Sequence, residues 1–515
     1  MDQSDKQATN RRESIGLAFF WLVVLAYGFF IPSILSWNTE SHLYPAFALV
    51  DHHTIRIDAY QQGLGDKSFH NGHYYTDKAP GLSFLAVPVY GAMRLAFPHA
   101  GISGFKLYKH IKNYYYIPQD VTYVRYAITY LLVALPSAVL AILMWLFLMR
   151  LTGDAGWSMA LAAVYALGTI AYVYSIWFFS HQICAILLFG AFLLIFYRIR
   201  GKEPDRRLLL SALGAGFLAG FSIISEYPTV IIAAILGIYM LVVARDRLRT
   251  LIAFVLGMAP PAALNIGYNL VAFGKPLAMG YLYVHSKAYH VHVHTGFLGI
   301  SNPFSYAIKA PSLNSLYEIT FGTYRGLFLV NPVLLLFFAG VFFMWKRRDV
   351  RAEMWLCVAI VLVYFLLDAS RGADTNGWSG GSSVASRHLT PMIPFMIVPI
   401  AFGLRDRSFR ALFVVWGAVS MAIMFMTVSS TYLFPYTDRN PIFNEVLPNF
   451  FHGKIIPNWV YVWRSSIGIT GFATLLPFFA IALLLIGWIV RILMAGVRPA
   501  PATQTVTELE TTLTR

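Results

Sequence analysis

Long apolar runs separated by short polar segments make up most of the chain. The runs approach the length of about 20 residues that an α-helix needs to cross the hydrocarbon core of a bilayer. They lie at roughly 15–35, 122–149, 157–178, 182–198, 208–225, 228–243, 250–272, 327–345, 354–368, 389–404, 410–428 and 467–490. The pattern predicts an all-α polytopic membrane protein with about twelve transmembrane helices, because helices satisfy their backbone hydrogen bonds within the segment.

The apolar stretch at 82–97 is ambiguous, because it is shorter than most of these runs. A crossing there would invert every later loop and place the arginine-rich loops on the outside. We therefore predict that residues 82–118 form interfacial helices at the outer surface, or a re-entrant segment, within a large first external loop.

Composition supports a membrane protein, since 58% of the residues are hydrophobic and only 12% are charged. Soluble domains carry about 25% charged residues. The formal net charge of +15 does not indicate a nucleic-acid partner, because the basic residues form short clusters between the apolar runs. The clusters are RIRGKEPDRR (198–207), ARDRLR (244–249), KRRDVR (346–351) and RDRSFR (405–410). Such loops are typical of the cytoplasmic side.

This topology predicts a cytoplasmic tail at 1–14, one membrane domain at 15–498, and a polar, disordered cytoplasmic tail at 499–515. The first apolar run follows Arg11 and Arg12 without a signal-peptidase-like site, so we expect it to remain as an anchor. Four loops are predicted to be external, at 36–121, 273–326, 369–388 and 429–466. We therefore expect a multi-pass protein of the cytoplasmic (inner) membrane whose site faces the outside or periplasm.

The first external loop combines acids and bases at the edge of an apolar segment. It contains Glu40, Asp51, Asp58, Asp66 and Asp77, interleaved with His42, Arg56, Lys67 and Lys78. A carboxylate near an interface can act as a general base toward a hydroxyl group. A lysine or arginine at headgroup depth can bind a lipid phosphate. A solvated loop with scattered ion pairs is the alternative interpretation.

The segment Asp77-Lys78-Ala79-Pro80 resembles the acid-Lys-Pro-Pro motif of the C-type (GT-C) membrane glycosyltransferases, with alanine where the first proline is usual. The similar branch contains the protein O-mannosyltransferases and the lipid A aminoarabinose transferases. Further pieces resemble a less characterised bacterial set: Ile57 to Tyr60, Asp66-Lys67, Gly72 to Gly81, Tyr324 to Phe328 and Ser386 to Leu389. The resemblance implies inverting transfer of one sugar from a polyprenyl-phosphate donor to a lipid, glycan or protein acceptor.

The resemblance also implies roles for particular residues. An acid of the first loop acts as the base, and Asp58 and Glu40 compete for that role. Positive charge near the donor phosphate stabilises the leaving group. The residues predicted to bind that phosphate are Lys78, Arg325, Arg387, His388 and His181. The residues predicted to support the site are Asp66, Lys67, Asp77 and Glu226.

The sequence predicts neither a metal nor another cofactor. His290, His292 and His294 alternate and contain a possible zinc pair, but no acid lies beside them. The first loop also contains no Asp-x-Asp pair. A transporter or flippase of a lipid-linked sugar is the alternative function, although the predicted spans hold almost no ionisable residue at mid-membrane and show no inverted repeat.

Overall fold

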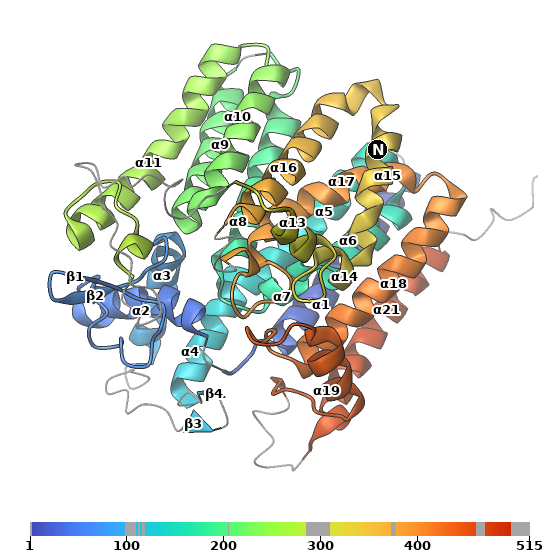
Figure 1. Ribbon diagram of the computed structural model, residues 1–515. Coiled ribbons are helices and arrows are strands. Elements are labelled where there is room, and N and C mark those ends of the chain that lie inside the picture. The colour runs from blue at the N-terminus through green and yellow to red at the C-terminus, as the bar shows by residue number, and fades with distance from the viewer. Residues whose placement is uncertain are drawn as a thin grey trace, which may run out of the picture.

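The computed structural model describes residues 3–34, 36–97, 110–111, 114–115, 119–203, 205–284, 310–371, 377–459 and 469–495. These residues form one bundle of helices (Figure 1), with two small hairpins as the only sheets among them. His290, His292 and His294, and the tail from 496 onward, lie outside the described residues.

Eight helical segments are long and apolar enough to cross a membrane. They contain α1 (Gln3–Phe29), α4 (Gln119–Thr129) with α5 (Leu135–Thr152), α8 (Ser180–Leu194), α9 (Arg206–Ser225), α11 (Arg247–Phe273), α16 (Arg351–Ala369), α18 (Arg407–Ser430) and α21 (Leu476–Ala495). The prediction of an all-α polytopic membrane protein is therefore confirmed.

Shorter helices complete the bundle. The apolar ones are α3 (Gly81–Ala96), α6 (Ala155–Gly168), α10 (Val230–Val243), α15 (Leu336–Trp345) and α17 (Ile393–Gly403). The remaining ones are α2 (Trp37–His52), α7 (Ile170–Ser175), α13 (Leu313–Thr320), α14 (Leu327–Val330) and α19 (Leu447–Phe451). A helix matches each predicted crossing, but several are short, so the count of about twelve stays a prediction.

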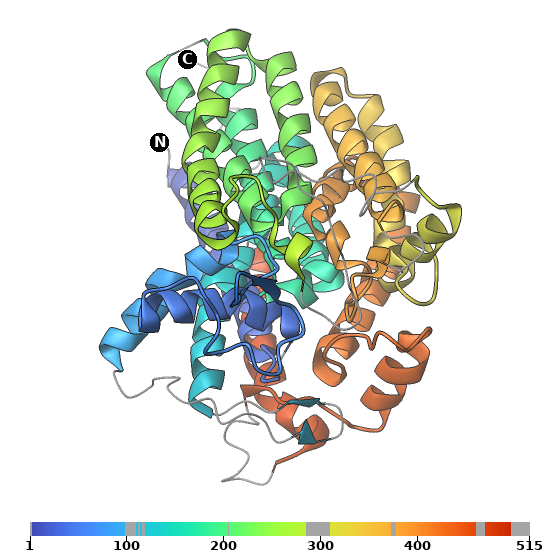
Figure 2. The same cartoon turned by 60° about the vertical axis from the view of Figure 1, so that its left-hand side comes forward.

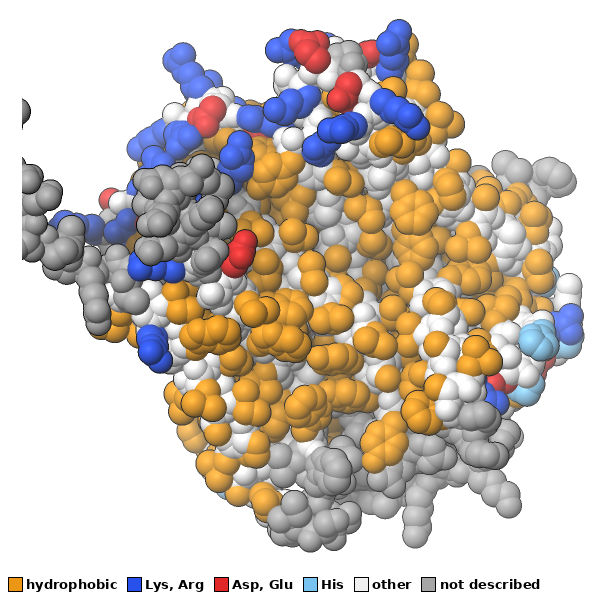
Figure 3. Space-filling model, turned by 180° about the vertical axis from the view of Figure 1, so that it is seen from behind, with side chains coloured by type: hydrophobic (Ala, Val, Ile, Leu, Met, Phe, Trp, Pro, Cys, Tyr) orange, Lys and Arg blue, Asp and Glu red, His pale blue; other side chains and the backbone are white. Residues whose placement is uncertain are grey.

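The basic clusters meet at one end of the bundle, which we call the basic end. Arg200 pairs with Glu353, whose side chain is fully buried, at 2.6 Å, and Arg245 pairs with Glu203. Figure 3 shows lysine and arginine side chains gathered along the top of the molecule, above a broad hydrophobic band. That band presents large apolar side chains to the surroundings, as a lipid-facing surface does.

The chain between residues 37 and 96 lies at the other end of the bundle. Helix α9 begins at Arg206 at the basic end, and its 20 residues span about 30 Å. Its last residue, Ser225, therefore lies at the opposite end, which we call the site end. Here α2 and α3 pack against each other and run across the direction of α9 to α11 (Figure 2).

A partly buried ion pair joins α2 to α3. Arg94 Nε lies 2.8 Å from Asp51 Oδ1, and Tyr90 donates a hydrogen bond of 2.6 Å to Asp51 Oδ2. Within 82–118, the stretch predicted to form interfacial helices, α3 is present, but β3 (His110–Ile111) and β4 (Tyr114–Tyr115) form a hairpin instead of a helix, and most of 98–118 lies outside the described residues. Helix α2 was not predicted, and it pairs with α3. Their depth in the bilayer stays a prediction.

Candidate functional site

The hairpin of β1 (Ser68–His70) and β2 (His73–Tyr75) carries the chain into the site. Asn71 and Gly72 form its two-residue turn, with φ of 48° and 84°. Asn-Gly suits such a turn because both positions need a positive φ. The motif that begins at Asn71 therefore starts as a tight turn that returns the chain toward the bundle.

Asp58 anchors this hairpin to the preceding loop. Its Oδ1 accepts a 2.7 Å hydrogen bond from the Tyr74 backbone N–H, and its Oδ2 lies 2.8 Å from Nδ1 of His73. Ile57 N–H donates to the carbonyl of Tyr74 at 2.9 Å. Both carboxylate oxygens of Asp58 are thus engaged in holding the loop, and its side chain is 43% exposed at the surface.

Lys78 is held between two carboxylates, and we call this group the Lys78 clamp. Its Nζ lies 2.9 Å from Asp66 Oδ2 and 2.8 Å from Asp77 Oδ2. Ser41, from α2, donates to Asp77 Oδ1 at 2.8 Å and so orients the inner carboxylate. Asp66 and Lys78 are partly exposed, whereas Asp77 is buried.

The clamp favours the charged forms of Lys78 and Asp66. Burial disfavours the Lys78 ammonium, but Asp66 and Asp77 outweigh burial and raise the pKa of Lys78. Burial also opposes the Asp66 carboxylate, but the Lys78 ammonium outweighs it and holds the pKa of Asp66 below its ordinary value. Burial raises the pKa of Asp77. Asp66 is therefore the ionised, partly solvent-accessible acid of the group.

Two glycines allow the clamp to sit against the bundle. A Cβ on Gly81, the first residue of α3, would lie 2.5 Å from Ser225 Oγ and 2.8 Å from the Ile224 carbonyl oxygen. A Cβ on Gly280 would lie 2.6 Å from the carbonyl oxygen of Thr76. The start of α3, three residues after Lys78, thereby packs against the end of α9, which immediately precedes Glu226 in the chain.

Three side chains from separate parts of the chain meet here, and we call them the His–Glu–His triad: His181, Glu226 and His388. The ligand-type atoms of the three lie within 4.8 Å of one another. His181 Nε2 lies 3.2 Å from His388 Nδ1 and 4.0 Å from Glu226 Oε2. Ser180, at the start of α8, donates to the same Glu226 oxygen at 2.9 Å.

A small cavity of about 10 Å³ adjoins the triad. Glu226, His388, Asp368 and Arg371 supply its polar lining. Asp368 is 2% exposed, and neither of its carboxylate oxygens has a hydrogen-bond partner among the described residues. The cavity is large enough for about one water molecule.

Arg387 is a second cation near the clamp, and it forms no salt bridge in the described part of the chain. Its guanidinium lies 5.4 Å from the ring of Phe179, and its buried Nε has no hydrogen-bond partner there. The charge of Arg387 acts on both Lys78 and Asp66. The DKAPG and SRHL motifs therefore meet in one place although they are far apart in the chain.

Two further first-loop residues are buried beside this group. Glu40 pairs with Arg125 at 3.0 Å, and both side chains are almost fully enclosed. Burial raises the pKa of Glu40 to about 7, against the opposing effect of Arg125. Burial, together with the nearby Lys78 ammonium, lowers the pKa of His42 to about 3, so His42 is neutral.

Two predicted cations are engaged elsewhere. Arg325 is fully buried and donates to the backbone carbonyls of Tyr324, Gly381, Phe434 and Pro435 at 2.8–3.2 Å. Burial lowers the pKa of Arg325 to about 10. Lys67 donates to the backbone and side-chain oxygens of Gln61. Both residues hold loops together.

The structure thus gathers Asp66, Asp77, Lys78, His181, Glu226, Arg387 and His388 at the site end. The other predicted residues have structural contacts. Asp58, Lys67 and Arg325 bind backbone groups of nearby loops, and Glu40 forms a buried ion pair with Arg125. Sequence analysis overlooked Asp368 and Arg371. The signal for these two was an acid at the end of an apolar run, followed three residues later by an arginine.

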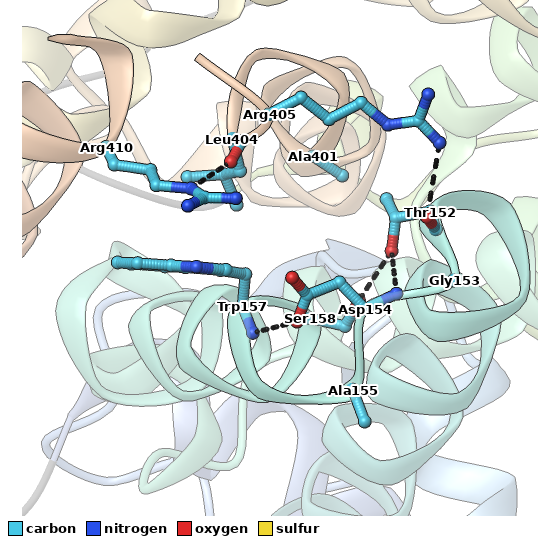
Figure 4. A pocket seen from close by; sticks show the side chains of 10 residues that line it. All are labelled: Thr152, Gly153, Asp154, Ala155, Trp157, Ser158, Ala401, Leu404, Arg405 and Arg410. Atoms are coloured by element: carbon cyan, nitrogen blue, oxygen red, sulfur yellow. Dashed lines mark hydrogen bonds between the residues drawn. The ribbon is translucent and has the colours of Figure 1, made fainter. Parts of the chain in front are cut away.

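A larger cavity, of about 370 Å³, lies at the basic end (Figure 4). Arg405 and Arg410 line it, but they donate to the backbone carbonyls of Thr152 and Leu404. Phe343 and Phe409, whose rings are 5.6 Å apart, connect this region to the cluster at 346–351. This cavity is separate from the triad, and the one carboxylate in its lining, Asp154, caps α6 by accepting a hydrogen bond from the Trp157 backbone N–H at 3.0 Å.

No protein-family model and no curated protein matches the chain. Two solved structures are similar to it at 14% identity, both of an oligosaccharyltransferase from Archaeoglobus fulgidus. One is AglB in complex with an inhibitory peptide and a dolichol-phosphate; the similarity covers 81% of this chain and 55% of that one, with a TM-score of 0.48. The other is an apo form, with 92% and 56% coverage and a TM-score of 0.41. The chain spans about half the length of these proteins, and the similarities are too weak to assign a function.

Proposed function

We propose that this protein transfers a single sugar, with inversion, from a polyprenyl-phosphate donor to a lipid, glycan or protein acceptor at the outer face of the cytoplasmic membrane. Residues 15–498 would form one membrane-embedded glycosyltransferase domain of the GT-C kind. The branch we favour is the one that contains the protein O-mannosyltransferases and the aminoarabinose transferases. Membrane lipids surround the domain.

One observation supports this proposal most directly. The Lys78 clamp, the His–Glu–His triad and the two cations Arg371 and Arg387 converge at the end of the bundle opposite the basic end. A phosphate leaving group gains negative charge as its bond to the sugar breaks, and fixed cations stabilise that charge. Neither Arg371 nor Arg387 forms a salt bridge among the described residues, although their charges act on Asp368 and Asp66, so both guanidinium groups can bind the phosphate.

We propose Asp66 as the general base. Its carboxylate is ionised and partly exposed, and the Lys78 clamp fixes its position. Asp58 already uses both oxygens in the hairpin, and Glu40 is enclosed with Arg125. Asp66 would take the proton of the acceptor hydroxyl group while the oxygen of that hydroxyl group bonds to the anomeric carbon of the sugar. The carbon–oxygen bond to phosphate breaks, and polyprenyl phosphate leaves.

The test is transfer of a labelled sugar from polyprenyl-phosphate-linked donors by purified protein in lipid nanodiscs. Asp66→Asn keeps the size of the side chain but removes its basicity, and loss of a general base costs about 10²–10⁴ in rate. Asp58→Asn should keep most of the transfer, because the change affects only the hairpin.

Two results would contradict the proposal. Equal rates for wild type and Asp66→Asn would exclude Asp66 as the base. Movement of labelled donor across proteoliposome membranes, without any transfer of sugar, would instead identify a transporter.

A further inference from the structure

We propose that the His–Glu–His triad is a binding site for one divalent transition-metal ion, with Zn²⁺ as the best match. His181 Nε2, His388 Nδ1 and Glu226 Oε2 would be the three protein ligands. The residues come from the start of α8, the end of α9 and the segment before α17, so only the folded chain assembles them. The metal-binding part of this inference does not depend on the proposed function.

The spacing of the atoms fits a tetrahedral site. Zn–N bonds of about 2.0–2.1 Å place two nitrogen ligands about 3.4 Å apart in tetrahedral geometry. The two imidazole nitrogens are 3.2 Å apart. The Glu226 oxygen lies 4.0 Å from His181 Nε2, and the three ligand atoms lie within 4.8 Å of one another, so Glu226 must move by on the order of 1 Å to reach the same spacing to both histidines. Its side chain is 23% exposed and so has room to adjust.

The chemistry of the donors points in the same direction. Imidazole is a preferred ligand of zinc, and two histidines with one glutamate leave a fourth position open. Without a metal ion, either His181 Nε2 or His388 Nδ1 must carry a proton and donate it to the other nitrogen. A metal ion would instead accept the lone pairs of both nitrogens.

The carboxylate of Asp368 is a second, independent indication of a ligand, because neither of its oxygens has a hydrogen-bond partner among the described residues, although the charge of Arg371 acts on it. It is buried, and it lines the same cavity as Glu226 and His388. A buried carboxylate without a hydrogen bond is costly. A metal-bound water in this cavity would be a partner for it. Arg371 also lines the cavity. If a phosphate oxygen of the donor replaced this water, Arg371 would face that oxygen; this role of Arg371 rests on the proposed function, whereas the metal site does not.

The experiment measures metal binding by the untagged, purified full-length protein, without donor or acceptor. Bound metal is first removed with a chelator, and Zn²⁺ is then added back and the excess removed; we expect about one Zn²⁺ per chain by mass spectrometry. Co²⁺ should give the visible absorption of a four-coordinate site. His181→Ala and His388→Ala should each weaken binding at least tenfold, a loss at the lower end of that seen when metal-site residues are changed.

Matched controls separate this site from other histidines. His452→Ala, at an exposed position in the described chain, should bind Zn²⁺ as wild type does. Glu226→Gln tests the carboxylate with little change in shape, and thermal unfolding identifies variants that fail to fold. Absence of binding by wild type would overturn the proposal. So would wild-type binding by folded His181→Ala, or loss of binding only when His290, His292 and His294 are replaced together. Metal binding without sugar transfer would leave this inference intact and contradict only the proposed function.

Discussion

At the scale of single residues, Glu40 and Arg125 illustrate how burial changes the role of an acid. Their side chains are 2% and 5% exposed, and they lie 3.0 Å apart. Arg125 also donates to the carbonyl of Ile34 at 2.8 Å, which ties α4 to the segment after α1. Breaking such a pair leaves an uncompensated buried charge, so we interpret it as structural.

Glu40 also predicts a pH dependence of stability. Its pKa is 4.5 in an unfolded chain and about 7 in the folded protein. Between these values the folded state holds a proton that the unfolded state has released, so this residue lowers the free energy of unfolding as pH rises. Glu40→Gln removes the effect. The stability of the variant relative to wild type should therefore increase between pH 4.5 and 7, by up to about 3 kcal/mol.

The measurement is thermal unfolding in detergent from pH 5 to pH 8. Loss of the ion pair with Arg125 changes the stability of the variant by a constant amount, so the prediction concerns only how the difference from wild type changes with pH. Glu13→Gln, at an exposed position, should give a curve parallel to that of wild type. A Glu40→Gln curve that also runs parallel would show that Glu40 is ionised throughout this range.

At the scale of elements, the contact between α3 and α9 brings the Lys78 clamp to the triad. The first residue of α3 must be small because the last turn of α9 passes directly over it. Pro80 precedes it and has the φ of a helix start, at −79°. The motif is therefore a turn, a clamp and a helix start in succession, and each part requires a particular residue type.

Gly81→Ala tests this contact. The new Cβ would meet the backbone carbonyl of Ile224, which cannot rotate away, and overpacking of this kind costs about 1–3 kcal/mol. Gly91→Ala in the same helix is the matched control, because its Cβ would have no neighbour closer than 3.9 Å. Replacing a helical glycine by alanine stabilises by about 0.5–1 kcal/mol where space allows. The unfolding temperature in detergent should thus fall for Gly81→Ala and rise for Gly91→Ala. Equal shifts for the two variants would argue against close packing of Gly81 on α9.

At the scale of the whole molecule, the basic end and the site end are separated by the length of α9. Ion pairs bind the arginine clusters to one another, and the apolar band lies between the two ends (Figure 3). The positive-inside rule assigns the basic end to the cytoplasm, which would place the triad outside.

Cysteine labelling in intact cells tests this orientation. Cys184 and Cys357 are both buried, so the background should be low. Gln62→Cys at the site end should react with a membrane-impermeant maleimide from outside. Arg348→Cys at the basic end should react only after the membrane is permeabilised. The reverse pattern would invert the molecule and move the proposed reaction to the cytoplasmic face.

The sequence by itself determined the class of fold, because hydropathy is a local property and each apolar run forms its helix largely independently of the others. It also located the motif from Asn71 to Gly81 and the histidines of the triad. The groups that each acid contacts depend on the tertiary structure. Asp58 and Asp66 look alike in the chain, yet the hairpin engages both oxygens of Asp58, whereas Asp66 pairs with Lys78. His181 and His388 are 207 residues apart, and their contact depends on how α8 and the segment before α17 pack. Packing over such separations is set by the shapes of many side chains together, so no local pattern encodes it.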